Sequence, residues 1–139
     1  MEQWIEWISQ NDTSLPSYIK SILSDDDGLT IISLDREKKN KVIIKFNGAL
    51  YTYRYTAERC FLKTLDYLSK NYQSSFIHGT TLFKVKNSQY LDWFKKESYD
   101  VWNSEEFKHY VVYTQEDVIE VLSPYPPEIE VKNIVKASE

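Results

Sequence analysis

The stretch HYVVYTQEDVIEVLSPYPPEIE, residues 109–130, predicts a β-hairpin followed by a proline-rich exit. In its first run, Tyr110 and Val112 alternate with Val111 and Tyr113. This alternation predicts one face packed on the core and another that presents aromatic and acidic groups. The segment SPYPPE should leave the sheet, because proline cannot donate a ladder hydrogen bond and its φ angle is fixed. The alternative is an edge strand that acids and prolines protect against aggregation.

A second pair of β-rich runs lies upstream, in KVIIKFNGALYTYRY, residues 41–55. Asn47-Gly48 at its centre is the preferred composition of a two-residue type I′ hairpin turn. The turn predicts a register in which one face is apolar and aromatic and must be buried. The predicted pairs are Phe46 with Ala49, Ile44 with Tyr51, and Val42 with Tyr53.

Two helices are predicted between these hairpins. AERCFLKTLDYLSKNY, residues 57–72, carries an apolar stripe at helical spacing that can cover a sheet. NSQYLDWFKKE, residues 87–97, predicts a helix with Asn87 or Ser88 as its N-cap. TTLFKV, residues 80–85, predicts a strand between them. The residues expected to be buried are Phe61, Leu65, Leu68 and Tyr72 on the first helix and Leu91 and Phe94 on the second.

The N-terminal part of the chain predicts helices as well. In TSLPSYIKSIL, residues 13–23, apolar residues recur at helical spacing behind a Thr13 or Ser14 N-cap. A shorter helix is expected around Trp4 and Trp7. LTIISL, residues 29–34, then predicts a strand.

These elements predict an α+β fold with a mainly antiparallel sheet of about five to six strands and two to four helices, in the order (α)αβββαβαββ. A chain of 139 residues, 42% hydrophobic and 15% aromatic, fits a single domain, 1–139, with its own core. We expect residues 1–27 to form an N-terminal helical segment and residues 28–131 the sheet-and-helix core.

Cytoplasmic localisation is expected for this chain. No apolar run approaches the ~18–20 residues that cross a bilayer, so no membrane association is predicted. The first residues lack the basic and apolar regions of a signal peptide. The single cysteine, Cys60, agrees with a reducing compartment.

No motif in the sequence names a reaction. Cys60 could act as a nucleophile with His78 or His109 as its base, but a free cysteine beside Phe61, on a helix facing the sheet, is expected to be buried and inert. Two histidines without a metal-binding spacing predict no zinc site. Three glycines are too few for a glycine-rich phosphate loop. We therefore expect no catalytic residue, no cofactor and no metal.

Acidic clusters give no stronger sign of catalysis. In DDDG, residues 25–28, a calcium loop starting at Asp25 would need a glutamate at its twelfth position, where Arg36 stands, so a solvated loop is expected. Neighbouring carboxylates at turns and tails are usually solvated rather than catalytic. These pairs are Glu105-Glu106, Glu116-Asp117 and Glu128-x-Glu130.

The distribution of charge is more informative. Residues 97–130 contain nine acids and one base, Lys108, whereas the whole chain has a net charge of only −4. Aromatic side chains beside acids can bind a basic protein surface by electrostatic steering and anchoring. The predicted partner-binding residues are Tyr99, Trp102, Glu105, Glu106, Tyr113, Glu116, Asp117 and Tyr125.

Two other kinds of function remain open. A pocket lined by Tyr51, Tyr53 and Tyr55 could serve a small-molecule sensor or an enzyme, although core packing also explains this row. A regulatory partner of a housekeeping complex could carry the same acidic surface. The lysine-rich run REKKNKVIIK, residues 36–45, lies in an acidic chain without a nucleic-acid motif, so nucleic-acid binding is not expected.

The layout of residues 29–130, and specifically LFKVKNSQYLDWF followed by HYVVYTQEDVIEVLS, resembles small uncharacterised proteins of Bacillus-type bacteria. Some such proteins are encoded beside polymorphic toxins as their immunity proteins or antitoxins. The resemblance implies a non-enzymatic protein that binds and blocks a toxin domain, often a nuclease. An acidic surface agrees with this function, because nuclease toxins bind their substrates through basic surfaces. The resemblance transfers no catalytic residue.

Overall fold

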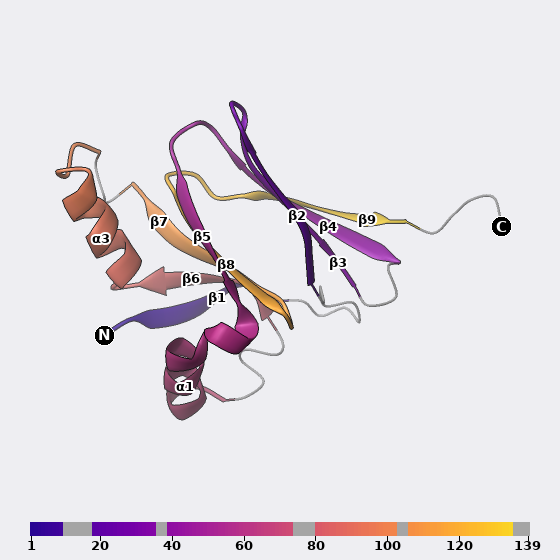
Figure 1. The fold of residues 1–139 in the computed structure, drawn as a ribbon, viewed down its shortest axis with the longest axis horizontal. Coiled ribbons are helices and arrows are strands. Elements are labelled where there is room, and N and C mark those ends of the chain that lie inside the picture. Colours follow the sequence, from indigo (N-terminus) through magenta and orange to yellow (C-terminus); the bar gives the residue numbers. More distant parts are fainter. Residues whose placement is uncertain (10–17, 36–38, 74–79, 103–105, 135–139) are drawn as a thin grey trace.

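The computed structural model has two antiparallel β-sheets packed face to face, with helices on the outer side of one of them (Figure 1). The structure describes residues 1–9, 18–35, 39–73, 80–102 and 106–134. Within these ranges the fold is α+β and mainly antiparallel, which confirms the predicted class. The sequence predicted about five to six strands, whereas the described residues form nine. None of the described helices is long and apolar enough to cross a membrane.

The first sheet, called sheet A, has the strand order β1-β6-β7-β8-β5. The second, sheet B, has the order β2-β3-β4-β9. All neighbouring strands are antiparallel. The strands of sheet A are β1 (Gln3–Ser9), β5 (Thr52–Ala57), β6 (Thr80–Lys86), β7 (Lys108–Tyr113) and β8 (Asp117–Ser123). Those of sheet B are β2 (Tyr18–Asp25), β3 (Gly28–Leu34), β4 (Asn40–Asn47) and β9 (Glu128–Asn133).

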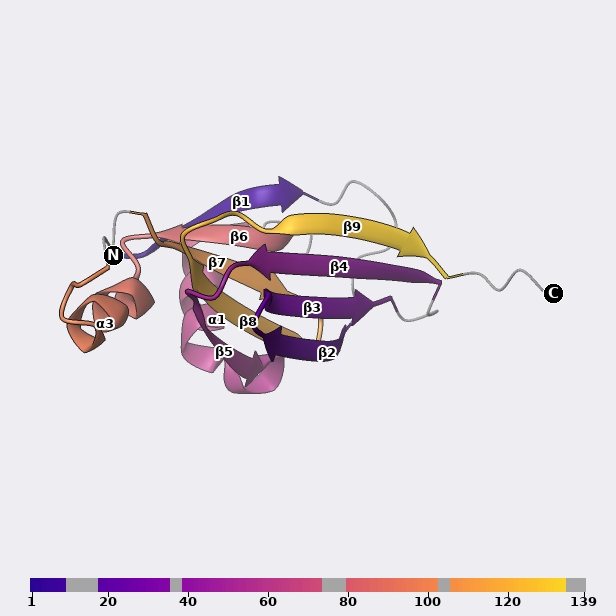
Figure 2. The ribbon, with the colours of Figure 1, turned by 90° about the horizontal axis from the view of Figure 1, so that it is seen from above.

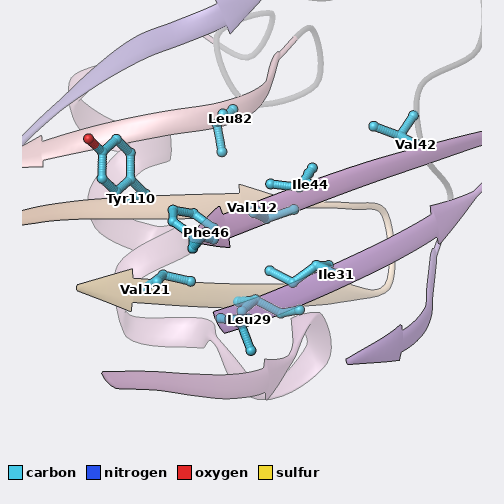
Figure 3. Packing of buried hydrophobic residues seen from close by; sticks show 10 residues of the cluster. Leu29, Ile31, Val42, Ile44, Phe46, Leu82, Tyr110, Val112 and Val121 are labelled. Carbon is cyan, nitrogen blue, oxygen red and sulfur yellow. The ribbon is translucent and has the colours of Figure 1, made fainter. Parts of the chain in front are cut away.

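The main core lies between the two sheets (Figure 3). Alternate residues of β3 and β4 point from sheet B toward β7 and β8 of sheet A, as the two-residue period of a strand requires. Removing these side chains from water supplies the largest favourable contribution to folding. The buried cluster consists of Leu29, Ile31, Val42, Ile44, Phe46, Leu82, Tyr110, Val112, Ile119 and Val121.

Two helices pack on the face of sheet A that points away from sheet B (Figure 2). After the short 3-10 helix η1 (Glu58–Cys60), α1 (Leu62–Asn71) places the predicted apolar stripe, with Leu68 fully buried, against β6, β7 and β8. Helix α3 (Gln89–Glu97) begins with Ser88 as its N-cap, as predicted. Its Leu91 and Phe94 pack on a small cluster at the other end of the sheet.

The predicted hairpin of β7 and β8 is confirmed, but both of its faces are buried. Sheet B covers the Tyr110 face and the helices cover the Tyr113 face. The predicted open face and the alternative of a protected edge strand are therefore both wrong. The proline-rich segment does leave sheet A, and it leads directly into β9 of sheet B.

The predicted hairpin at Asn47-Gly48 is wrong, because β4 and β5 belong to different sheets. Phe46 pairs with Leu29 of β3, and Tyr53 pairs with Val121 of β8. The turn composition permits a positive φ, and Gly48 has φ +99°, but the chain uses it to cross between the sheets. Long-range pairing with apolar strands outweighs the local hairpin preference here.

The N-terminal helical segment predicted for residues 1–27 is also wrong where the structure describes it, because β1 and β2 lie there. The predicted Thr13 or Ser14 N-cap lies outside the described residues. In β1, Trp4 is buried and Ile5 is exposed, which is the alternation of a strand. In β2, a register shift lies between Ile19 and Ser21. This bulge puts Ile19 and Ile22 on the same core-facing side, although they are three residues apart. The core-facing residues of this bulged strand therefore recur at the three-residue spacing that is typical of a helix.

Gly28, at the start of β3, should be the least replaceable glycine described. It has φ +134°, and a Cβ atom there would lie 2.1 Å from the Phe46 carbonyl oxygen. Gly48 is also at positive φ but has open space around it. We expect Gly48→Ala to lower the free energy of unfolding by about 1 kcal/mol and Gly28→Ala by about 3 kcal/mol or more, because only the second adds overlap to backbone strain. Urea denaturation measures both, and equal losses would contradict the role of this close contact.

Candidate functional site

Two of the connections between the sheets lie at the same end of the molecule. One connects β4 to β5 and the other connects β8 to β9. Trp102, Glu106 and Phe107, which follow α3, lie beside both crossings. Together they enclose an open depression of about 300 Å³, which we call the crossover hollow. It is lined by Asn47, Gly48, Ala49, Leu50, Trp102, Glu106, Phe107, Pro124 and Tyr125.

Local hydrogen bonds shape the walls of the hollow. The Ser123 hydroxyl accepts from the Tyr125 N–H at 3.2 Å and donates to the Tyr125 carbonyl at 3.0 Å, which fixes the start of the second crossing. The Gly48 N–H donates to the Asp27 carbonyl at 3.1 Å. This bond holds the turn between β2 and β3 beside the first crossing.

Aromatic and acidic groups meet in the hollow. Trp102 and Tyr125 are 45% and 62% exposed, far more than core aromatic residues. Within the part of the chain that the structure describes, the Glu106 carboxylate has no hydrogen-bond or ion-pair partner. The neighbouring turn adds three exposed acids, Asp25 to Asp27. The hollow therefore combines apolar contact area with negative charge.

The predicted contact set is divided between two ends of the molecule. Trp102, Glu106 and Tyr125 come together in the hollow, as predicted for one surface. Tyr99 is 90% exposed in the turn after α3. Glu116 lies beyond the far end of β7, a six-residue strand that spans about 20 Å. Glu105 lies outside the described residues.

Tyr113 and Asp117 are buried, so their prediction as partner-binding residues is wrong. The Asp117 carboxylate accepts from the Ile19 N–H of β2 at 2.7 Å and from the Tyr55 hydroxyl. The bond to Asp117, together with desolvation, raises the pKa of Tyr55. Burial, with the nearby Glu58 carboxylate, raises the pKa of Tyr113 to about 12. Asp117 thus fastens sheet B to sheet A instead of meeting a partner.

A polar network with a buried centre runs across sheet A, and no sequence pattern predicted it. Arg54 Nε and Nη2 donate to the two Glu120 carboxylate oxygens at 2.7 and 3.0 Å. His109 Nε2 lies 3.0 Å from Glu120 Oε1, and His109 Nδ1 lies 2.7 Å from the Ser88 hydroxyl. The Arg54 guanidinium also lies 4.0 Å from the centre of the Tyr90 ring. A signal was present in DVIEVL, where Glu120 interrupts an apolar run.

The hydrogen-bond partners of Glu120 stabilise the ionised form of its carboxyl group. Burial alone would raise the pKa of this carboxyl, but the hydrogen bonds and charges of His109 and Arg54 outweigh burial and lower it. An ionised carboxylate only accepts hydrogen bonds, so His109 Nε2 donates to Glu120.

Ser88, His109 and Glu120 form a hydrogen-bonded chain with the same connectivity as a hydrolase triad. Their surroundings nevertheless favour a structural role. The Ser88 hydroxyl already accepts from the Leu91 N–H as the N-cap of α3. Ser88 and His109 are 3% and 1% exposed. The network fastens α3 and β5 to the centre of sheet A.

The other predicted chemistry can be compared with the structure residue by residue. Cys60 is exposed in η1, so its predicted burial is wrong. Tyr53 and Tyr55 are exposed on the edge strand β5. The Tyr51 hydroxyl forms a hydrogen bond with the hydroxyl of Ser24, which lies in β2 just before Asp25–Asp27. These three tyrosines therefore do not line a common interior cavity. Among the described residues there is no group of three metal-ligating side chains.

Two further depressions lie beside α3. One, of about 430 Å³, is lined by Met1, Glu2, Lys63, Thr64, Tyr67 and Gln89. Its Glu2 carboxylate already accepts from the Gln89 N–H at 2.8 Å. The other, of about 480 Å³, has three lysines, Lys86, Lys95 and Lys108, and one acid, Asp92, in its wall. Neither combines unpaired acid with exposed aromatic rings as the crossover hollow does.

Comparisons with known proteins returned no matching family model, no matching curated protein and no matching solved structure.

The stability of the fold should depend on pH through Glu120. Its pKa is lower in the folded chain than the ordinary value of 4.5. The unfolded state therefore binds more protons below pH 4.5, and the stabilisation is lost as pH falls through the folded pKa. Glu120→Gln should lower the free energy of unfolding at pH 7 by about 2 kcal/mol, the contribution of hydrogen bonds to a charged group, and flatten its fall in acid. Glu116→Gln, at an exposed acid, is the control.

Urea denaturation from pH 7 to pH 2 measures both effects. Parallel curves for the wild type and Glu120→Gln would show that this carboxylate is not the acid-sensitive group.

Proposed function

We propose that this protein is a cytosolic binding protein of the immunity or antitoxin kind, which blocks a basic protein partner through the crossover hollow and the adjacent acidic turn. The observation that carries the proposal is the assembly of Trp102, Glu106 and Tyr125 around one depression beside Asp25–Asp27. Asp25–Asp27 lie far in the sequence from the other three residues. An arrangement of exposed aromatic anchors and acids fits recognition of a basic surface.

The proposed action is occlusion and involves no chemical step. The acids would attract a positively charged surface over distances near the Debye length, about 8–10 Å at physiological salt. The exposed rings would then bury apolar area at the centre of the contact. A nuclease-type toxin domain is a suitable partner, because its substrate-binding surface is basic. The resemblance to immunity proteins supports the same class of partner.

Other proposed classes have less support. The tyrosine row is exposed or hydrogen-bonded rather than arranged as a pocket. In sheet B, Lys45 of β4 pairs in register with Glu128 of β9, so its charge is balanced, whereas Lys41 pairs with Lys132. The lysine-rich run lies in an acidic chain without a nucleic-acid motif. A housekeeping partner would use the same surface, and only its identity would distinguish it from a toxin.

Affinity purification of the tagged protein from its own cells at low salt should capture one basic protein in stoichiometric amount, identified by mass spectrometry. Trp102→Ala and Glu106→Lys should each reduce the capture at least about tenfold, because hot-spot residues contribute on the order of 2 kcal/mol or more. Glu116→Lys reverses an equal charge at the far end of β7 and should keep the partner.

Two results would overturn the proposal. Capture that is lost equally with Glu116→Lys would mean that overall charge, rather than the hollow, determines binding. Recovery of the protein alone, with each variant folded by circular dichroism, would mean that it has no such partner under these conditions.

A further inference from the structure

The protein already contains a complete site for a guanidinium group. The Arg54 side chain stacks on the Tyr90 ring at 4.0 Å and forms two hydrogen bonds to the Glu120 carboxylate, at 2.7 and 3.0 Å. This arrangement uses an aromatic face for the flat cation and a carboxylate for its edge. It shows which side chains hold an arginine in this fold.

The crossover hollow has the same two components without the cation. Trp102 and Tyr125 supply aromatic surface, and tryptophan is the strongest cation–π acceptor. Glu106 supplies a carboxylate, and the described residues include no cation that pairs with it. A carboxylate with no partner beside exposed rings attracts a positive group from outside.

The size of the hollow limits its occupant. Its volume of about 300 Å³ lies at the small end of the roughly 300–1,000 Å³ that ligand pockets occupy. This space accommodates one long side chain rather than a nucleotide cofactor. Leu50 and Pro124 add apolar wall against which the methylene groups of such a side chain can pack.

A guanidinium fits these components better than an ammonium. Arginine is planar and weakly hydrated, so it stacks on an indole or phenol ring at a smaller desolvation cost than lysine. Two of its five N–H groups can also meet both oxygens of one carboxylate, as Arg54 does with Glu120.

We propose that the crossover hollow binds an arginine side chain of the partner protein, with the guanidinium against Trp102 and Tyr125 and its N–H groups donating to Glu106. This inference rests on the proposed function, because it names the group that the partner inserts at the centre of the contact.

Nuclear magnetic resonance of the full-length 15N-labelled protein tests the inference directly. The chain has four tryptophans, so its indole N–H region is simple, and Trp102→Phe assigns the signal of Trp102. The probes are acetyl-Gly-Arg-Gly-amide and the same peptide with lysine or with uncharged citrulline. The arginine peptide should shift the Trp102 signal, the lysine peptide should bind more weakly, and the citrulline peptide should have no effect.

Matched variants locate the carboxylate. Glu106→Gln should weaken binding of the arginine peptide roughly tenfold, since hydrogen bonds to charged groups are the stronger ones. Glu116→Gln removes an equal charge at the other end and should leave the affinity unchanged within about twofold. Equal shifts with arginine and citrulline peptides, or equal effects of the two variants, would overturn the inference.

The outcomes separate this inference from the proposed function. A silent Trp102 signal, together with partner capture that still needs Glu106, would refute the arginine site and leave the binding function standing. A specific response to the arginine peptide, with no protein partner captured, would support the site and refute the proposed function.

Discussion

The burial of both faces of the β7–β8 hairpin is the constraint on which the rest of the structure depends. Sheet B covers one face and the helices cover the other, so each buried polar side chain on these strands must find a partner inside the protein. Glu120 and Asp117 therefore form hydrogen bonds with elements that are distant in the sequence. Glu120 holds Arg54 of β5 and, through His109, the start of α3, whereas Asp117 holds the N–H of Ile19 in β2. Leaving any of these groups unpaired would cost more than the bond itself contributes.

Local patterns predicted those elements whose burial is one-sided or whose ends are capped. The stripe around Leu68 and the Ser88 cap were visible because a helix determines its own spacing and its own first turn. Strands depend on partners that lie far away in the sequence, and this is where the sequence-based prediction failed. The bulge after Ile19 changed a two-residue period into a helical one, and a turn-forming Asn47-Gly48 joined two sheets instead of two neighbouring strands.

The candidate site was predicted in part for a related reason. Composition alone showed that residues 97–130 are acidic and aromatic, and Trp102, Glu106 and Tyr125 do share one surface. Composition could not show which acids are buried and hydrogen-bonded inside the fold. Asp117 and Glu120 are buried in hydrogen bonds, while the acidic turn at Asp25, far away in the sequence, lies beside the hollow. The acids that lie around the hollow are thus not the same residues as the acids that are clustered in the sequence.

The geometry of the crossings explains why this end can be a prepared binding surface. Only four residues, 48–51, join β4 to β5, and four, 124–127, join β8 to β9. Five Cα–Cα steps separate the strand ends in each crossing, which is at most about 18 Å against the roughly 10 Å between packed sheets. Both crossings are therefore short, and hydrogen bonds fix their starts: the Gly48 N–H donates to the Asp27 carbonyl, and the Tyr125 backbone bonds to the Ser123 hydroxyl. The backbone at Gly48 and Tyr125 is thus already ordered, so less of the binding free energy is lost in ordering it.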